Sequence, residues 1–482
     1  MQGFRRRYNY LIVGAGIYGL ALALELRRVL PDASIVVVEA GALGEHAITV
    51  NTSGIIRHSY SDPEIHAAAS YGLPFFRDPA RAMDLPGAQP TFTRVGWARL
   101  LNDRHQPGSA AMAAAVVEQA HNLGHVQSQI LSTKEFISQL ESIWRSNVER
   151  CFDQEDFTHV VWEDDGGWAD GSGSLRLFAA AARRHDVEIV FNTRVTDFKR
   201  KGDRVIGVLA ARPNHPDAEP LIINADVVVL AAGLWLRHLV ERATGLRMPV
   251  VPMYHQIVIA HTSPEFPLST TQVSVAGGHT RTIVAIPVIS YWRDSYFRPE
   301  GDGILIGLHH SELQAEDYVP RGGELPGGIR VGLDQAMLDA LVASAPQIPL
   351  LAEGAIKLGS RAEDLSGGHY VMNPEEMPFE GPVPGTDHSL FVIGSGCGTG
   401  FKLGPGVARL LADRLLGHVR SFKETGRALS IERAEYFYPS TTPDSDLHGL
   451  FKPVQAGGRF RHIGAAGVAA AAESQAPAAR TG

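Results

Sequence analysis

The sequence contains very little cysteine: Cys151 and Cys397 are the only two in 482 residues. Two cysteines cannot form a disulfide framework or a cysteine-based zinc site, and a reducing, cytoplasmic setting is therefore expected. Metal-binding spacings are also lacking, because none of the 20 histidines belongs to an H-E-x-x-H or comparable pattern. The hydrolase motif G-x-S-x-G is absent as well. We expect no metal site and no nucleophile elbow of the kind found in hydrolases.

Positive charge is not in excess, and no apolar run is long enough to cross a membrane. The net charge is −8 and the pI is about 6.2, so the chain has no electrostatic footprint for nucleic acid. The apolar run after "RRRY" is interrupted by Gly14, Gly16 and Gly19, and no cleavage-type site follows it. We expect no nucleic-acid partner and no integral membrane segment, and an oligomer remains possible.

What is present is the composition of a large globular protein. Apolar residues make up 44%, charged residues 20% and aromatic residues 8%. A chain of 482 residues is typical of two intertwined or three simple domains. Strand, turn, helix and strand alternate near both ends, whereas segments between 251 and 310 alternate as in an antiparallel sheet. The pattern predicts an α/β protein with a β-rich insertion, and a helix from about Ser174 to His185.

The clearest motif is a dinucleotide signature. Gly14, Gly16 and Gly19 form G-x-G-x-x-G between a strand and a helix, and Glu39 ends the next strand 20 residues later. The glycines permit a tight turn, approach to a pyrophosphate and close packing, and a carboxylate at Glu39 suits ribose hydroxyls. NAD and FAD share this fingerprint, so other segments must decide between them.

Two further segments favour FAD. "ADVVVLAAG", followed by Leu234 and Trp235, resembles the strand and turn that close over the dinucleotide in FAD proteins of the glutathione-reductase superfamily. "NTRV", ending at Val195, resembles the segment whose valine touches the adenine. The glycine-rich turn near the C-terminus, "GSGCGTGFK", supports the same cofactor.

A more specific resemblance covers most of residues 8–420. "TSGIIRHSY" and "GSGCGTGFKLGPGVARLLAD" resemble segments of monomeric sarcosine oxidases, which belong to the D-amino-acid-oxidase-like (DAO) superfamily. The resemblance implies a Rossmann-like FAD-binding domain of glutathione-reductase type with an inserted antiparallel substrate domain. The implied FAD domain spans 1–95, 160–250 and 355–455, the cap spans 96–159 and 251–354, and 456–482 is a flexible tail.

The resemblance also assigns residues. Arg57 and Lys402 would hold a substrate carboxylate, and Tyr296 and His255 would line the pocket opposite the flavin. The residues expected around FAD are Gly14, Gly16, Gly19, Glu39, Ala40, Thr52, Ser53, Val195, Ala232, Gly233, Trp235, Gly398, Thr399, Gly400, Phe401 and Lys402.

The chain departs from that pattern at several positions. Gly54 replaces an arginine and Thr399 a histidine, so the substrate is expected to differ from sarcosine. The cysteine that attaches flavin would fall near Val371, which predicts non-covalent FAD. The lysine associated with oxygen activation would fall near Leu305, which favours a dehydrogenase over an oxidase.

The expected reaction is oxidation of the C–N bond of an amino acid or N-substituted amino acid, by hydride transfer to flavin N5, to give an imine. Two alternatives remain open. One is a 2-hydroxy-acid dehydrogenase, for which His58 or His255 would be the base. The other is a flavin-carrying subunit whose site a partner completes.

Overall fold

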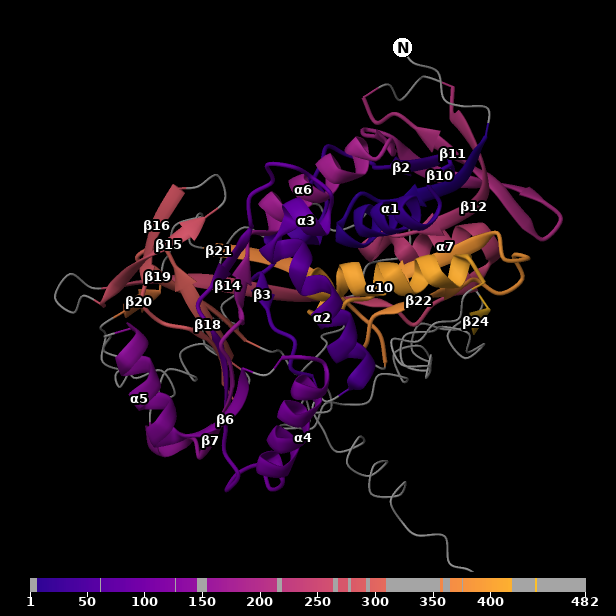
Figure 1. Ribbon diagram of the computed structural model, residues 1–482. Coiled ribbons are helices and arrows are strands. Elements are labelled where there is room, and N and C mark those ends of the chain that lie inside the picture. Colours follow the sequence, from indigo (N-terminus) through magenta and orange to yellow (C-terminus); the bar gives the residue numbers. More distant parts are fainter. Residues whose placement is uncertain are drawn as a thin grey trace, which may run out of the picture.

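We examined the protein as a computed structural model (Figure 1). It describes residues 7–60, 62–125, 127–144, 154–214, 219–262, 268–275, 279–291, 295–308, 356–358, 365–374, 376–417 and 438–439. The expected flexible tail, 456–482, lies outside these residues.

One half of the molecule is built on an eight-stranded sheet. Its central strands are parallel and mostly apolar, as expected for strands that helices cover on both faces. The order β10-β11-β12-β1-β2-β9 continues through β23 on β12 and β22 on β23. The strands are β1 (Tyr8–Val13), β2 (Ile35–Val38), β9 (Glu188–Val190), β10 (Arg194–Lys201), β11 (Arg204–Ala211), β12 (Leu221–Leu230), β22 (Phe379–Pro382) and β23 (Leu390–Gly394).

Helices pack tightly on this sheet because small residues let their backbones approach. A Cβ at Gly406 of α10 would lie 2.4 Å from the carbonyl oxygen of Ala68 in α2, so only glycine fits there. The predicted helix near Ser174 begins earlier, since Asp170 caps it through the N–H groups of Ser172 and Gly173. The helices are α1 (Ile17–Val29), α2 (Pro63–Arg77), α3 (Pro79–Ala82), α6 (Gly171–Arg184), α7 (Leu236–Thr244) and α10 (Gly400–Leu415).

The other half contains a nine-stranded sheet in the order β20-β14-β19-β18-β17-β5-β7-β6, with β21 also paired to β14. The strands are β5 (Trp97–Leu101), β6 (Ser128–Ser132), β7 (His159–Glu163), β14 (Val251–Thr262), β17 (Val288–Ser290), β18 (Ser295–Glu300), β19 (Gly303–Leu308), β20 (Ile356–Leu358) and β21 (Leu365–Met372). Helices α4 (Ser109–Asn122) and α5 (Thr133–Trp144) accompany it (Figure 1). The antiparallel pairs β14–β19, β14–β21 and β18–β19 agree with the pattern read between 251 and 310.

Smaller ladders complete the fold. A three-stranded sheet joins β3 (Ile55–Ile56), β8 (Gly167–Ala169) and β4 (Phe92–Arg94). Strand β15 (Thr270–Val275) pairs with β16 (His279–Val284), and β13 (Leu246–Arg247) with β24 (Tyr438–Pro439). Short 3₁₀ turns lie at Ile48–Asn51, Gln154–Asp156 and Gly233–Trp235.

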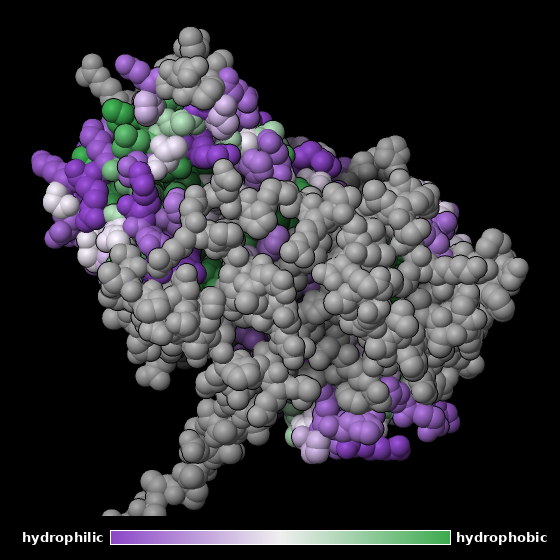
Figure 2. All heavy atoms as spheres, turned by 180° about the vertical axis from the view of Figure 1, so that it is seen from behind, coloured by the Kyte–Doolittle hydropathy of each residue, from purple (hydrophilic) through white to green (hydrophobic). Residues whose placement is uncertain are grey.

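The surface is that of a protein with its apolar side chains inside. From behind, the lobe with β10–β12 shows mostly hydrophilic residues with small apolar areas between them (Figure 2). Ile130 and Ile222 are the only large apolar residues that are exposed in the described part of the chain. Within that part, no helix has both the length and the apolar character needed to cross a membrane.

Candidate cofactor and substrate site

The first glycine turn lies between β1 and α1, where the sequence predicted it. Gly14 has φ +107° and its N–H donates to the carbonyl of Val38 at 2.8 Å. A Cβ at Gly19 would lie 1.9 Å from the carbonyl oxygen of Gly14, whereas a Cβ at Gly16 would meet nothing closer than Thr49 Oγ1 at 3.8 Å. Gly19 therefore serves packing, and Gly16 leaves open space at the N-terminus of α1.

That helix terminus is suited to an anion. Gly16 occupies the N-cap without a side-chain hydrogen bond, and the first turn of α1 holds no acidic residue. Glu39 Oε2 accepts a hydrogen bond from the N–H of Ala15 at 2.8 Å, and Thr49 Oγ1 accepts from the N–H of Ile17 at 3.3 Å. The positive end of the helix dipole, with the first-turn N–H groups that these two acceptors do not engage, is the usual receptor for a pyrophosphate.

A cavity of about 540 Å³ extends from this turn to the nine-stranded sheet. Most of the predicted cofactor residues line it: Gly14, Gly16, Glu39, Ala40, Thr52, Ser53, Val195, Ala232, Gly233, Trp235, Gly398, Gly400 and Phe401. Gly19, Thr399 and Lys402 do not belong to the lining. The shape and the lining fit a dinucleotide cofactor.

The second glycine turn, between β23 and α10, closes the cavity. Ser395, Cys397 and Gly398 have φ values of +53°, +44° and +79°, so three residues of this turn are left-handed. Tyr370 approaches it so closely that a Cβ at Gly398 would lie 2.9 Å from its ring. Cys397 lines the cavity, and burial raises the pKa of its thiol to about 12, so the thiol stays neutral.

Thr399 does not present a polar group to the cavity. It is the N-cap of α10, and its hydroxyl donates to the carbonyl of Gly396 at 2.7 Å. The first turn of α10 has no acidic residue and no side-chain cap, so its N–H groups offer a second positive helix end.

Arg57 lies just after β3 in an aromatic setting. Its guanidinium carbon is 3.9 Å from the ring centre of Tyr60 and 4.9 Å from that of Trp97. Its Nη1 donates to the carbonyl of Ser59, and within the described residues it forms no ion pair. Gly54 precedes it with φ +70°, and a Cβ there would lie 2.2 Å from the carbonyl oxygen of Ala169, so no larger residue fits.

Lys402 lies in the first turn of α10 and is only 8% exposed. Burial and the charge of Arg57 lower its pKa to about 7, although Glu163 acts in the opposite direction. The structure thus brings Arg57 and Lys402 within electrostatic range of each other. Lys402 has neither a hydrogen bond nor an ion pair in the described part of the chain.

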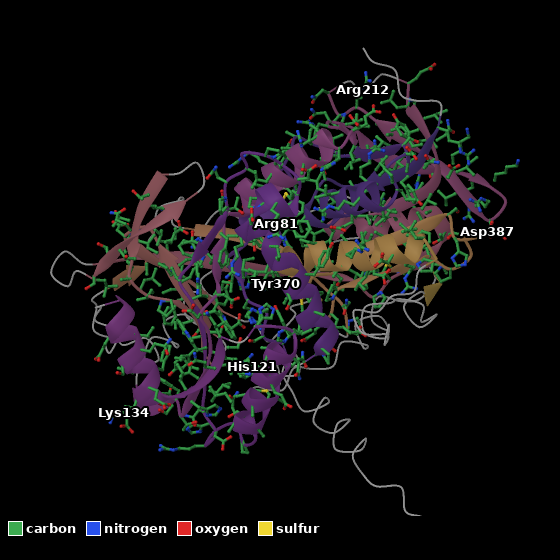
Figure 3. All side chains as sticks on the ribbon, viewed as in Figure 1. Arg81, His121, Lys134, Arg212, Tyr370 and Asp387 are labelled. Atoms are coloured by element: carbon green, nitrogen blue, oxygen red, sulfur yellow. The ribbon has the colours of Figure 1, made fainter. Side chains whose placement is uncertain are left out.

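Tyr296 and His255 form a second polar pair on the nine-stranded sheet. His255 Nε2 and the Tyr296 hydroxyl are 2.8 Å apart, and His255 stacks on Tyr370 with ring centres 4.4 Å apart. His255 and Tyr370 line the cavity, and Figure 3 places Tyr370 near the middle of the molecule. Tyr296 packs with Leu305 and Ile55, and burial raises the pKa of its hydroxyl to about 12.

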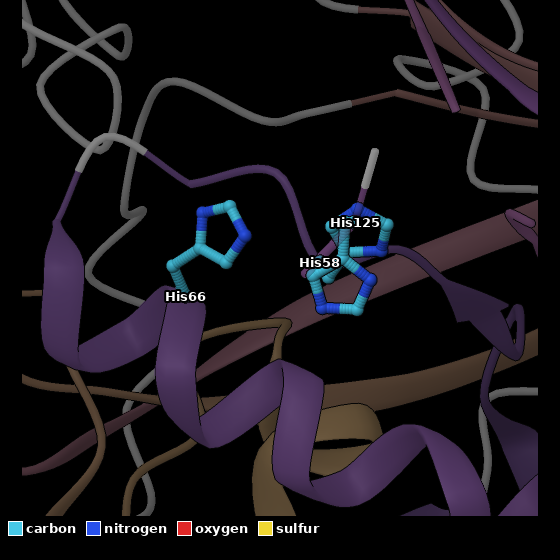
Figure 4. Close-up of side chains that lie close together, drawn as sticks. All are labelled: His58, His66 and His125. Carbon is cyan, nitrogen blue, oxygen red and sulfur yellow. The ribbon is translucent and has the colours of Figure 1, made fainter. Parts of the chain in front are cut away.

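Three histidines from separate elements gather beside the Arg57 segment, which chain spacing alone did not predict. Figure 4 shows the stacked rings of His58 and His125, with Nε2 of His66 turned toward them. The His58 and His125 ring centres are 3.6 Å apart with an interplanar angle of 18°. A metal lies in the plane of each imidazole that binds it, so these two stacked rings cannot share one ion as they stand.

Asp165, the second residue of the acidic pair Asp164–Asp165, belongs to the same cluster. Asp165 is mostly buried and lies 3.6 Å from His58, 3.7 Å from His125 and 3.6 Å from Arg77. Burial acts against the charge of Asp165, but the hydrogen bond from His125 and the neighbouring cations lower its pKa to about 2. The carboxylate is held by partners in the fold.

Two charged residues near the site were missed. Glu163 is fully buried at the end of β7 and contacts the segment after Arg57. Arg298 is 6% exposed, and its Nε donates to the carbonyl of Ser53 at 2.7 Å. A charge next to large apolar side chains in a strand, as beside Trp162 in "HVVWE" and Phe297 in "SYFRPE", was the signal that could have indicated both.

The two glycine turns and the sheet that faces them define a class, a dinucleotide-dependent oxidoreductase. The chain belongs to the family described as FAD dependent oxidoreductase (DAO), which matches residues 9–414. The expected family, the enzyme class and the mixed α/β fold with a Rossmann-like sheet are confirmed, and the family implies a flavin cofactor.

The chain is similar to curated proteins over only part of the length of those proteins. Mitochondrial dimethylglycine dehydrogenase of Mus musculus is 25% identical over 324 residues, which cover 65% of this chain and 33% of that protein. Sarcosine oxidase subunit beta of Rhodobacter capsulatus is 26% identical over 250 residues, which cover 52% of this chain and 55% of that protein. The match therefore spans a third to about half of these relatives.

Solved structures show the same fold. The L-amino acid deaminase from Proteus myxofaciens in complex with anthranilate has a TM-score of 0.65 at 17% identity, covering 90% of this chain and 95% of that one. Glycine oxidase from Geobacillus kaustophilus has a TM-score of 0.63 at 16% identity, covering 89% and 100%.

Proposed function

We propose that the chain oxidises the C–N bond of an amino acid or N-substituted amino acid to an imine, with FAD held non-covalently in the cavity. The anion clamp formed by Arg57 and Lys402 carries this proposal. The two cations come from segments 345 residues apart (402 − 57), and each lacks an ion pair in the described residues. A substrate carboxylate would supply the missing negative charge.

Some of the cofactor residues would bind the FAD, and others would influence the charge on its flavin ring. The N–H groups at the start of α1 suit the pyrophosphate, and Glu39 suits the ribose. The bound flavin supplies the redox chemistry by accepting a hydride. The positive end of α10 favours negative charge beside it. Val371, which lines the cavity, offers no nucleophile, in keeping with a non-covalent flavin.

The substrate would be oriented from two sides. Arg57 and Lys402 would fix its carboxylate, while the His255–Tyr296 pair would offer a polar partner to its amine. Residues 53–57 connect the two sides, because Ile55 packs against Tyr296 two residues before Arg57. Such two-sided anchoring aligns a reacting C–H bond at little entropic cost during the reaction. Water then hydrolyses the released imine.

We propose a dehydrogenase in preference to an oxidase. Leu305 packs among Ile257, Tyr296 and Ile55, so the position carries an apolar side chain where a lysine would stabilise negative charge on oxygen. Relatives named as a dehydrogenase and as an oxidase subunit both match, so the electron acceptor must be measured.

An anaerobic titration tests the reaction. Purified yellow protein is titrated with amino, N-methylamino and 2-hydroxy acids, and the loss of visible flavin absorbance is followed. Amino or N-methylamino acids should bleach the flavin, and bleaching by hydroxy acids alone would contradict the proposal. Oxygen is then admitted, and fast recovery of colour would contradict the dehydrogenase assignment.

The clamp has a separate test. Arg57→Ala should raise KM for the carboxylate substrate by about 10- to 100-fold, because a charge-assisted hydrogen bond is lost. The visible spectrum of the bound flavin should stay unchanged. Arg104→Ala, at an exposed arginine, is the matched control. An unaltered KM in Arg57→Ala would contradict the clamp and would mean that Arg57 has only a structural role.

A second candidate is a flavin-carrying subunit. It is favoured by relatives whose names describe subunits, including the sarcosine oxidase subunit beta. This role predicts flavin binding with turnover only after a second chain is added. The hydroxy-acid alternative is weaker, because one of its two candidate bases, His58, is packed between Glu163, Asp165 and Ser128. The other candidate, His255, lines the cavity.

We further propose two structural units and a cytoplasmic location. The units follow the expected FAD ranges (1–95, 160–250 and 355–455) and cap ranges (96–159 and 251–354). One change to these ranges is proposed: β7, β20 and β21 fall almost entirely within the FAD ranges by number but pair within the nine-stranded sheet, which supports moving them to the cap.

A further inference from the structure

Glu163 holds the segment that follows Arg57. Its Oε1 accepts a hydrogen bond from the N–H of Ser59 at 2.7 Å, and its Oε2 accepts from the N–H of His58 at 3.0 Å. His58 Nδ1 lies 3.3 Å from the same Oε2. A fully buried carboxylate is costly unless it is paired, and here adjacent backbone N–H groups satisfy both oxygens. The carboxylate therefore fixes the backbone on which Arg57 is mounted.

The same carboxylate acts on the second cation of the clamp. Lys402 is destabilised as a cation by burial and by Arg57, while Glu163 favours its charged form. A buried cation is repelled strongly by a partly buried neighbour of the same charge where water is excluded. A fixed anion beside them offsets this repulsion until a substrate carboxylate arrives.

We propose that Glu163 is a positioning residue for the anion clamp: it orders the Arg57 segment and supplies the negative charge that keeps Lys402 protonated. This role rests on the proposed function, because it concerns the site assigned to the substrate carboxylate. Glu163 ends β7 of the nine-stranded sheet and Lys402 lies in the first turn of α10, so the pair couples the two halves of the molecule across the site.

The charged surroundings supply a control. Arg57 and Glu163 act on Lys402, while His58 and Tyr60 face Glu163 from the Arg57 segment. Behind His58 lie Asp165, His125 and Arg77. Asp165 Oδ1 lies 3.6 Å from His58 Nδ1, so Asp165 contacts His58 as Glu163 does. Of these two carboxylates, it is Glu163 that raises the pKa of Lys402. Asp165→Asn therefore removes a neighbouring charge without removing the one assigned to Lys402.

The test measures binding of acetate to the flavin-loaded protein, from the perturbation of the flavin spectrum between pH 6 and 9. In the wild type, affinity should fall as the pH rises through about 7, where Lys402 loses its proton. In Glu163→Gln the midpoint of this fall should move down by roughly one pH unit, and affinity at pH 7 should drop about fivefold. Asp165→Asn should keep the wild-type midpoint.

Several results would overturn the inference. They are an unchanged midpoint in Glu163→Gln, or an equal displacement in Asp165→Asn. Glu163→Asp keeps the charge and should keep the midpoint even if affinity is lower, so displacement to the Gln value would refute the electrostatic role. If Glu163→Gln does not fold, Lys402→Met must abolish the fall, and persistence of the fall would refute the assignment.

Acetate binding requires no turnover, so this test is separate from that of the reaction. A protein that no amino acid bleaches would count against the proposed function and leave the acetate result standing. A wild-type protein that binds no acetate would overturn the clamp and with it the role of Glu163.

Discussion

Lys402 is an unusual lysine, because its ammonium group is buried beside another cation. Burial and Arg57 lower its pKa to about 7, from 10.5. Below pH 7 the side chain carries a positive charge, and above pH 7 it progressively loses it. The second positive charge of the proposed clamp is therefore present mainly on the acid side of neutrality.

Turnover should follow that charge. KM for the carboxylate substrate is expected to be lowest below pH 7 and to rise by up to about tenfold per pH unit above it, with the flavin still bound. Lys402→Met should have a high KM already at pH 6 and little change up to pH 8. Steady-state KM measured at each pH checks this, and parallel profiles for both proteins would argue against it.

At the scale of elements, the β1–α1 turn assigns different tasks to two of its glycines. Gly19 is in contact with the backbone of Gly14, whereas Gly16 borders open cavity. A methyl group added at one position meets protein, and at the other meets only the space for the cofactor.

The two alanine variants should therefore fail differently. Gly19→Ala should impair folding, since its Cβ would overlap a carbonyl oxygen. Gly16→Ala should fold with an unchanged circular dichroism spectrum and bind FAD at least about tenfold more weakly, through loss of close approach to the pyrophosphate. The FAD affinity of each variant is measured by titrating the apoprotein with FAD. Wild-type affinity in Gly16→Ala would refute the assignment of this turn to the pyrophosphate.

Helix α2 introduces a pH sensitivity of another kind. His66 lies in its first turn, and burial with the neighbouring His58 lowers the pKa of His66 to about 3. In the unfolded chain the His66 side chain binds a proton near pH 6.5, whereas in the native chain it stays neutral down to about pH 3. The free energy of unfolding therefore falls as the pH drops below 6.5.

The loss should amount to about 1–2 kcal/mol between pH 6.5 and pH 5 from this group. His66→Gln should flatten the decline of thermal stability over that interval, even if its absolute stability is lower. His105→Gln, at an exposed histidine, is the control and should keep the wild-type slope. Equal slopes in His66→Gln and wild type would contradict the assignment.

At the scale of the whole molecule, the cavity touches both large sheets, so a ligand in it should stabilise the whole fold. FAD at 100 times its dissociation constant should add about 2.7 kcal/mol and raise Tm by a few degrees. Melting of apoprotein with and without FAD measures this. Gly16→Ala should show a smaller rise at the same FAD concentration, and no rise in the wild type would contradict the cavity assignment.

Local patterns predicted much of this architecture, because strand, turn and helix at Gly14–Gly19 and at Gly398–Gly400 are determined by neighbours in the chain. Resemblance, not periodicity, indicated the pairing of Arg57 with Lys402. Glu163 and the three-histidine cluster were missed because their partners come from distant strands and helices. Contacts of that kind depend on how β7, α2 and the residues after α4 pack, which spacing along the chain does not encode.

The residues from Thr49 to Arg57 serve several purposes within nine positions. Thr49 accepts a hydrogen bond from the first turn of α1, Thr52 and Ser53 border the cavity, Ile55 packs against Tyr296, and Arg57 is one of the two cations of the proposed clamp. An engineer who randomises this stretch to change substrate preference would at the same time sample loss of flavin. Libraries for new substrates would be better directed to inward positions of β14 and β18, where a substitution leaves the dinucleotide turn untouched. The protein's capacity to acquire new substrates is therefore greatest on the sheet that faces the cofactor.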